Sequence, residues 1–84
     1  MKVTVRFFAL YRELVGVRET VVELAEGSTA LELWQRFADG HPQLAANLPH
    51  TRFAVNGEYS SAEVRLHEGD EVAFIPPVSG GSDV

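Results

Sequence analysis

The residues best suited to chemistry in this chain lie near its carboxyl end. There an apolar strand, Glu71 to Ile75, runs into Pro76-Pro77 and then into Val78-Ser79-Gly80-Gly81. Proline cannot donate to a sheet ladder and favours extended backbone, and glycine has no Cβ to obstruct a narrow channel. A glycine pair is common in frayed chain ends. The stiff proline pair directly after a core strand favours instead a tail that is threaded into another protein.

The chemistry open to such a tail is activation of a carboxyl carbon. A free carboxylate is a poor electrophile, whereas an acyl-adenylate carries a good leaving group, which a sulfide donor displaces to leave a thiocarboxylate. The sequence contains no cysteine, so a thiol nucleophile, a disulfide framework and a thiolate metal site are excluded. The histidines, His41, His50 and His67, fall in unrelated turns, and no Ser-His-Asp or paired-carboxylate arrangement is present. We therefore expect a co-substrate with no metal and no bound cofactor, not a catalyst.

Length and charge limit the classes of function. With 84 residues, 45% of them hydrophobic, the chain can form one small core but no deep active site of its own, so its chemistry needs a partner. A formal net charge of −5 and seven scattered basic residues argue against nucleic-acid or anionic-membrane binding. The N-terminus shows neither a signal peptide nor an apolar span, so we expect a cytoplasmic protein.

The first quarter of the chain predicts a β-hairpin. Residues from Lys2 to Ala9 alternate between apolar and polar, as in a half-buried strand, and this parity puts Phe8 on the solvent side. Tyr11 to Val15 predicts a short helical turn that ends at Gly16. Glu19 to Leu24 is rich in β-branched residues and predicts the second strand.

The next segment predicts the main helix. Thr29 and Glu32 form a capping box, with Ser28 as the alternative cap, and Gly40 closes the helix. A weaker helical turn is expected around residues 43–47. The apolar positions of the main helix recur at three- and four-residue steps: Ala30, Leu33, Trp34, Phe37 and Ala38.

The remaining elements complete a fold of the α+β class. Strands at 52–55 and 58–60 flank Asn56-Gly57, a strong hairpin signal, and a turn at 67–70 leads into the last strand. The order β-β-α-β-β-β predicts a ubiquitin-like β-grasp, a mixed sheet with one main helix packed across one face. We expect the first and last strands to pair in parallel at its centre. The expected domain covers residues 1–78, and 79–84 form a tail. The predicted core is Val5, Phe7, Leu33, Trp34, Phe37, Phe53, Val55, Val72 and Phe74.

Two motifs resemble those of a known family. Phe7-Phe8-Ala9 followed by Arg12-Glu13-Leu14-Val15-Gly16, and the run from Gly69 to Gly81, are similar to the small subunit of molybdopterin synthase, the MoaD family of ubiquitin-like sulfur carriers. The resemblance implies that an ATP-dependent, MoeB-like activating enzyme adenylates Gly81, that sulfur is then installed there, and that the large, MoaE-like subunit accepts the tail. Sulfur then passes to a pterin precursor in molybdenum cofactor biosynthesis.

The resemblance also implies a docking surface. Phe8, Tyr59 and Ile75 fall near strand positions that share one sheet face, and by resemblance they contact the large subunit together with Arg12. The alternative is that each is simply a partly buried sheet residue, and for Ile75 the two interpretations are equally weighted. The tail residues assigned to partner binding or sulfur transfer are Pro76, Pro77, Val78, Ser79, Gly80 and Gly81.

The chain departs from the family pattern after the glycine pair. Ser82-Asp83-Val84 locks the carboxyl group of Gly81 in a peptide bond. Either a protease trims the chain, or these residues are a remnant of a fusion, or carrier activity has been lost. Three classes of function therefore stand: a sulfur carrier for molybdopterin or, alternatively, for thiamine or tRNA thiolation; a ubiquitin-like protein modifier; and a non-catalytic docking module.

Overall fold

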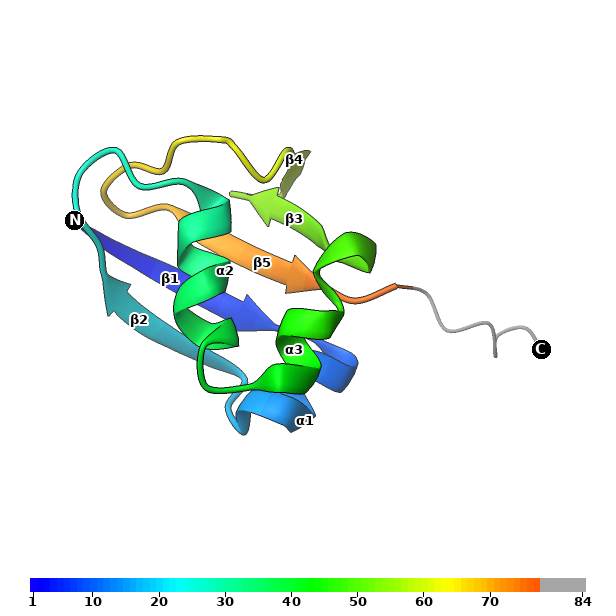
Figure 1. The fold of residues 1–84 in the computed structure, drawn as a ribbon. Helices are drawn as coiled ribbons and strands as arrows, with labels where there is room; N and C mark the ends of the chain where they lie inside the picture. Colours follow the sequence, from blue (N-terminus) through cyan, green and yellow to red (C-terminus); the bar gives the residue numbers. More distant parts are fainter. Residues whose placement is uncertain (78–84) are drawn as a thin grey trace.

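The computed structural model describes residues 1–77 of the chain (Figure 1). Five strands and three α-helices form these residues, together with one 3-10 turn. Their bounds are β1 Lys2–Phe7, α1 Ala9–Val15, β2 Glu19–Glu23, α2 Ala30–Ala38, α3 Pro42–Ala46, η1 Leu48–His50, β3 Arg52–Val55, β4 Glu58–Ser60 and β5 Glu71–Ile75. The predicted domain boundary at residue 78 lies just beyond this range and stays a prediction.

The strands form one mixed sheet in the order β2-β1-β5-β3-β4. The central pair, β1 and β5, is parallel, with Val5 opposite Val72, and the other neighbouring pairs are antiparallel. Helix α2 crosses one face of the sheet, and α3 lies beside it (Figure 1). The ubiquitin-like β-grasp and the parallel central pairing are therefore confirmed.

Aromatic side chains fill the space between α2 and the sheet. Trp34 from the helix meets Phe53 and Phe74 edge-to-face, with ring centroids 5.9 and 5.1 Å apart. Seven of the nine predicted core residues are buried. The other two, Phe37 and Val55, are partly covered and pack against the edge of the core. Phe37 lies in the last turn of α2, where the covering layer ends.

The core also contains residues that the sequence pattern did not assign to it. Tyr11, Leu44 and Leu66 are almost fully buried. Tyr11 comes from α1, Leu44 from α3 and Leu66 from the loop before β5. These elements are too short to show a hydrophobic period, so their burial depends on tertiary packing.

Local sequence signals predicted most ends of the helices and strands correctly. Thr29 and Glu32 form the predicted capping box, whereas Ser28 instead donates its hydroxyl hydrogen to the carbonyl of Ala25. Asn56 and Gly57 both have positive φ, 52° and 86°, as a type I′ hairpin turn requires. The predicted first strand is two residues too long, because Phe8 is the extended N-cap of α1.

Candidate docking surface and the root of the tail

The sheet face turned away from the helices carries a hollow built on two alanines. Ala54 of β3 pairs with Ala73 of β5, and on either side of them lie Tyr59 of β4 and Arg6 of β1. Two methyl groups between larger side chains leave a depression of about 290 Å³. Its lining consists of Arg6, Phe8, Ala54, Gly57, Tyr59, Glu71, Ala73 and Ile75. We call this depression the alanine hollow.

Three residues predicted to bind a partner meet at the alanine hollow. Phe8 is 39% exposed and Tyr59 is 68% exposed, while Ile75 is half-buried at the end of β5. The parity argument that placed Phe8 outside the core is therefore confirmed. Arginines cover the two aromatic rings: the Cζ of Arg6 is 5.7 Å from the Phe8 ring centre, and that of Arg52 is 5.3 Å from the Tyr59 ring centre. Apolar surface of this kind, rimmed by charge, is typical of protein contacts.

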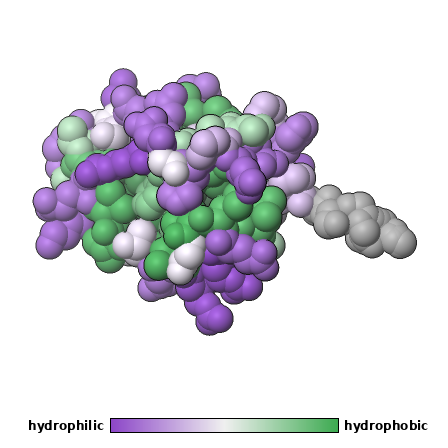
Figure 2. Space-filling view, turned by 60° about the horizontal axis from the view of Figure 1, so that its bottom comes forward, coloured by the Kyte–Doolittle hydropathy of each residue, from purple (hydrophilic) through white to green (hydrophobic). Residues whose placement is uncertain are grey.

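Two more of the predicted site residues, Pro76 and Pro77, lie at the root of the tail. Pro76 and Pro77 continue from β5 and line a second hollow of about 460 Å³, together with His50, Arg52, Tyr59 and Ile75. Arg12 is exposed on α1, apart from both hollows. Val78, Ser79, Gly80 and Gly81, which carry the proposed chemistry, lie outside the described residues. Figure 2 shows hydrophobic surface interspersed with polar residues over the part of the domain seen there.

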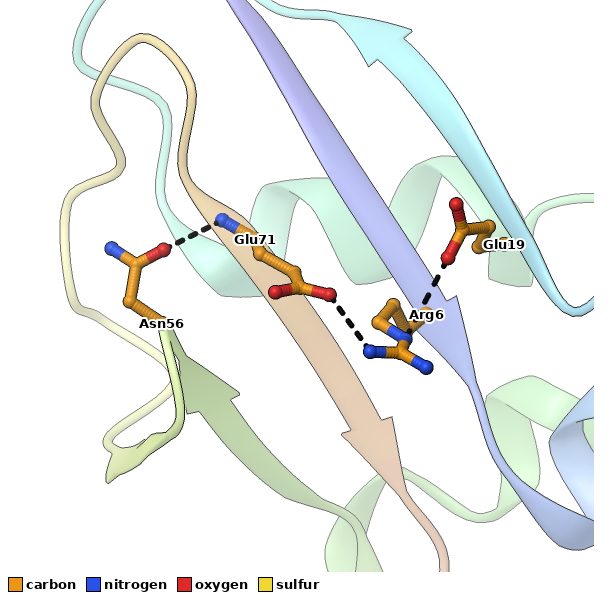
Figure 3. A network of polar contacts seen from close by, with 4 residues as sticks. All are labelled: Arg6, Glu19, Asn56 and Glu71. Atoms are coloured by element: carbon orange, nitrogen blue, oxygen red, sulfur yellow. Dashed lines mark hydrogen bonds and ion pairs between the residues drawn. The ribbon is translucent and has the colours of Figure 1, made fainter.

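A polar network holds the charged edge of the alanine hollow. Arg6 reaches Glu71 on one side at 3.1 Å and Glu19 on the other at 3.7 Å (Figure 3). The side-chain oxygen of Asn56 accepts a hydrogen bond from the backbone N–H of Glu71 at 2.9 Å. Exposed ion pairs of this kind contribute at most about 1 kcal/mol each. The network thus orients Arg6 more than it stabilises the domain. Strand parity puts Arg6 and Glu71 on the same face of the sheet, and the register of β1 against β5 brings them into contact.

Tyr11 joins α1 to the segment before β3. Its hydroxyl lies 2.5 Å from Oγ1 of Thr51, which itself donates to the carbonyl of Asn47 at 2.8 Å. Burial raises the pKa of the Tyr11 hydroxyl, and the hydrogen bond to Thr51 opposes that rise. This link fixes α1, and with it the position of Phe8, against the segment that leads into Arg52. No pattern in the sequence predicts this link.

Within residues 1–77 no group of three or more metal-binding side chains gathers, and no helix is long and apolar enough to cross a membrane. The three histidines lie apart: the ring of His41 contacts the carbonyl of Phe37, His50 ends η1, and His67 is 3.9 Å from Asp70. The described residues thus present two surface hollows near the root of the tail.

The described residues form a small β-grasp domain with the alanine hollow beside the last strand. The ThiS family model matches residues 5–81, so the chain belongs to the ThiS family. Among its relatives is the molybdopterin synthase sulfur carrier subunit of Chlamydomonas reinhardtii, 40% identical over 96% of this chain and 100% of that protein. The subunit of the same name from Escherichia coli is 42% identical over 94% of this chain and 99% of that protein.

Solved structures show the same fold. Subunit 1 of a molybdopterin converting factor from Pyrococcus furiosus has a TM-score of 0.82 at 34% identity, covering 93% of this chain and 99% of that one. SAMP1 from Haloferax volcanii has a TM-score of 0.83 at 27% identity, covering 96% of this chain and 100% of that one. A chain in the complex of subunits 1 and 2 of the converting factor from Helicobacter pylori has a TM-score of 0.63 at 23% identity, covering 96% and 100%, which shows the fold alone.

Proposed function

We propose that this protein is the sulfur carrier of molybdopterin synthase, with sulfur held as a thiocarboxylate on Gly81. The observation that carries the proposal is the match over nearly the whole chain to proteins named molybdopterin synthase sulfur carrier subunit. The position of the alanine hollow supports it, because Ile75 borders that hollow and is the last strand residue before the tail.

In this proposal the tail carries the reactive group and the folded domain binds the partners. An activating enzyme uses ATP to form an acyl-adenylate at Gly81, and a sulfide donor displaces the nucleotide. The resulting thiocarboxylate is ionised at neutral pH and is a soft nucleophile. Docking through the alanine hollow then fixes the tail relative to the reaction centre. This makes the sulfur transfer effectively unimolecular and orients the reacting atoms. The domain itself contributes binding and position.

The partners follow from the same scheme. The large subunit of molybdopterin synthase contacts the alanine hollow and receives the tail in its active site. There sulfur passes to the pterin precursor. The word "subunit" in the relatives' names supports such an assembly. Because the scheme consumes ATP, we place it in the cytoplasm. Ser82, Asp83 and Val84 follow Gly81 in the sequence, so a protease has to remove them before Gly81 can be adenylated.

A fold neighbour named small archaeal modifier protein 1, from Haloferax volcanii, favours one alternative, in which activated Gly81 is joined to lysines of other proteins. Mass spectrometry of digested lysates distinguishes the two, since only a modifier leaves the tail's glycines on target lysines.

Pyrophosphate exchange tests the proposal. The chain ending at Gly81 and the chain ending at Val84 are each incubated with the activating enzyme and ATP. We expect exchange only with the Gly81 form, because adenylation requires a free α-carboxylate at the residue that the site accepts. Three further extended residues add about 10 Å, which carries Val84 past that position. Equal exchange by both forms overturns the processing step, and silence from the Gly81 form overturns the carrier assignment.

A further inference from the structure

Charge is unevenly distributed along the sheet. Four arginines lie at the end from which the tail leaves, where β1 and β5 finish and β2 and β3 begin: Arg6, Arg12, Arg18 and Arg52. The carboxylates that reach that end include Glu13, Glu19 and Glu71, and the last two both contact Arg6. At the opposite end, carboxylates outnumber basic groups: Glu23, Glu26, Glu58, Glu68 and Asp70. The tail thus leaves from the end of the sheet at which four of the six arginines lie.

Arg52 is the arginine nearest to the tail. Its backbone pairs with Ile75, and its side chain lines the 460 Å³ hollow with His50, Pro76 and Pro77. The guanidinium lies over the Tyr59 ring at 5.3 Å, which holds one face of the planar group and leaves its edge for hydrogen bonding.

Arg52 differs from arginines that have partners inside the domain. Arg6 pairs with two carboxylates, and Arg65 donates to the carbonyl of Gly27. For Arg52, no carboxylate of residues 1–77 lies within 4 Å. Glu63 lines a neighbouring hollow together with Arg52 and Tyr59, and the two charged side chains form no ion pair there. An arginine that is oriented by an aromatic ring and has no carboxylate of its own is a ready receptor for one.

We propose that Arg52 binds a carboxylate side chain at the mouth of the channel through which the large synthase subunit takes the tail. This inference rests on the proposed function and adds a partner chemistry to it. Any channel that receives residues beyond Pro77 must bring its rim against Pro76 and Pro77, and Arg52 lines the same hollow as these prolines. The matching rim group is an Asp or Glu, which the guanidinium fork holds in two hydrogen bonds. The contact fixes how far the tail enters.

The test is a titration of the large subunit of the same organism with variants of the full chain, at low and at high salt. Arg52→Gln should weaken binding about tenfold at low salt and reduce the salt dependence, since one charge-assisted contact is lost. The affinity of Arg52→Lys should lie between those of wild type and Arg52→Gln, because lysine keeps the charge but not the two parallel hydrogen bonds of the guanidinium. Lys2→Gln is the matched control: it removes the same charge from an exposed position at the opposite end of the sheet. Thermal unfolding of each variant checks that the fold is kept.

The outcomes separate the inference from the function that it rests on. If wild type binds and Arg52→Gln binds as tightly as Lys2→Gln, the inference is wrong and the proposed function stands. If wild type does not bind the large subunit at all, both fail. The same titration with chains ending at Gly81 tests whether Arg52 instead binds a carboxylate from the end of its own chain. An Arg52→Gln effect confined to the longer chain would assign the arginine to the chain's own Asp83 or Val84 carboxylate and overturn the inference.

Discussion

Tyr59→Ala separates docking from folding at the alanine hollow. Tyr59 is 68% exposed, so of roughly 220 Å² of side-chain area about 150 Å² is free to be covered by a partner. At about 25 cal/mol per Å² this area corresponds to about 4 kcal/mol. Binding energies fall short of such sums, so we expect a loss of about 2 kcal/mol, or about thirtyfold in Kd.

The effect of Tyr59→Ala on the fold should be smaller. Only a third of the ring is covered in the free domain, and its contact with Arg52 is an exposed one. We therefore expect the free energy of unfolding to fall by about 1 to 1.5 kcal/mol. Urea unfolding measures this quantity, and calorimetric titration with the large subunit measures the Kd.

Two control variants sharpen the comparison. Tyr59→Phe keeps the ring and should bind nearly as wild type. Val21→Ala truncates a side chain of similar exposure, 62%, on the same sheet face but outside the hollow. If Val21→Ala weakens binding as much as Tyr59→Ala, or if Tyr59→Ala leaves the Kd unchanged, the alanine hollow is not the docking site.

Three further predictions follow from the packing. Ala73→Leu fills the alanine hollow from its floor and should abolish docking by occlusion while the domain stays folded, as titration together with a thermal melt will show. Phe37→Ala should lower the free energy of unfolding by about 2 to 3 kcal/mol, below the range for a fully buried ring, since Phe37 is only partly covered against Phe7 at 5.0 Å; a melt close to wild type would contradict its packing role. Because the pKa of Tyr11 is raised in the folded state, its contribution to stability is complete below about pH 10 and is lost as pH rises through the folded-state value. Urea unfolding at increasing alkaline pH should therefore show a shallower decline for Tyr11→Phe than for wild type, and equal slopes would contradict the prediction.

Strand parity and turn chemistry carried most of what the sequence could predict about the fold. Alternation alone placed Phe8 outside the core, and Asn56-Gly57 located the second hairpin, because both signals depend on backbone geometry over a few residues. Tyr11 and Leu44 escaped prediction for the opposite reason. Each lies on a helix too short to show a period, and contacts distant in sequence bury it.

The candidate site divides in the same way. The tail motif is visible in the sequence itself, and the resemblance to the family predicts Phe8, Tyr59 and Ile75 as partner-binding residues. That these three residues line one hollow is shown only by the structure. The paired alanines beneath them and the position of Arg52 beside the prolines depend on the register of β3 against β5. Register of this kind is set by strands that are far apart in the chain, and no local pattern specifies it.

The intact mass of the chain ending at Gly81 tests the central claim most directly. The protein is incubated with the activating enzyme, ATP and a sulfide donor, and its mass is then measured before and after addition of the large subunit with the pterin precursor. Sulfur transfer through Gly81 predicts that one oxygen is replaced by sulfur in the first step and restored in the second. A mass that never changes, although pyrophosphate exchange shows that Gly81 is adenylated, would contradict a thiocarboxylate carrier.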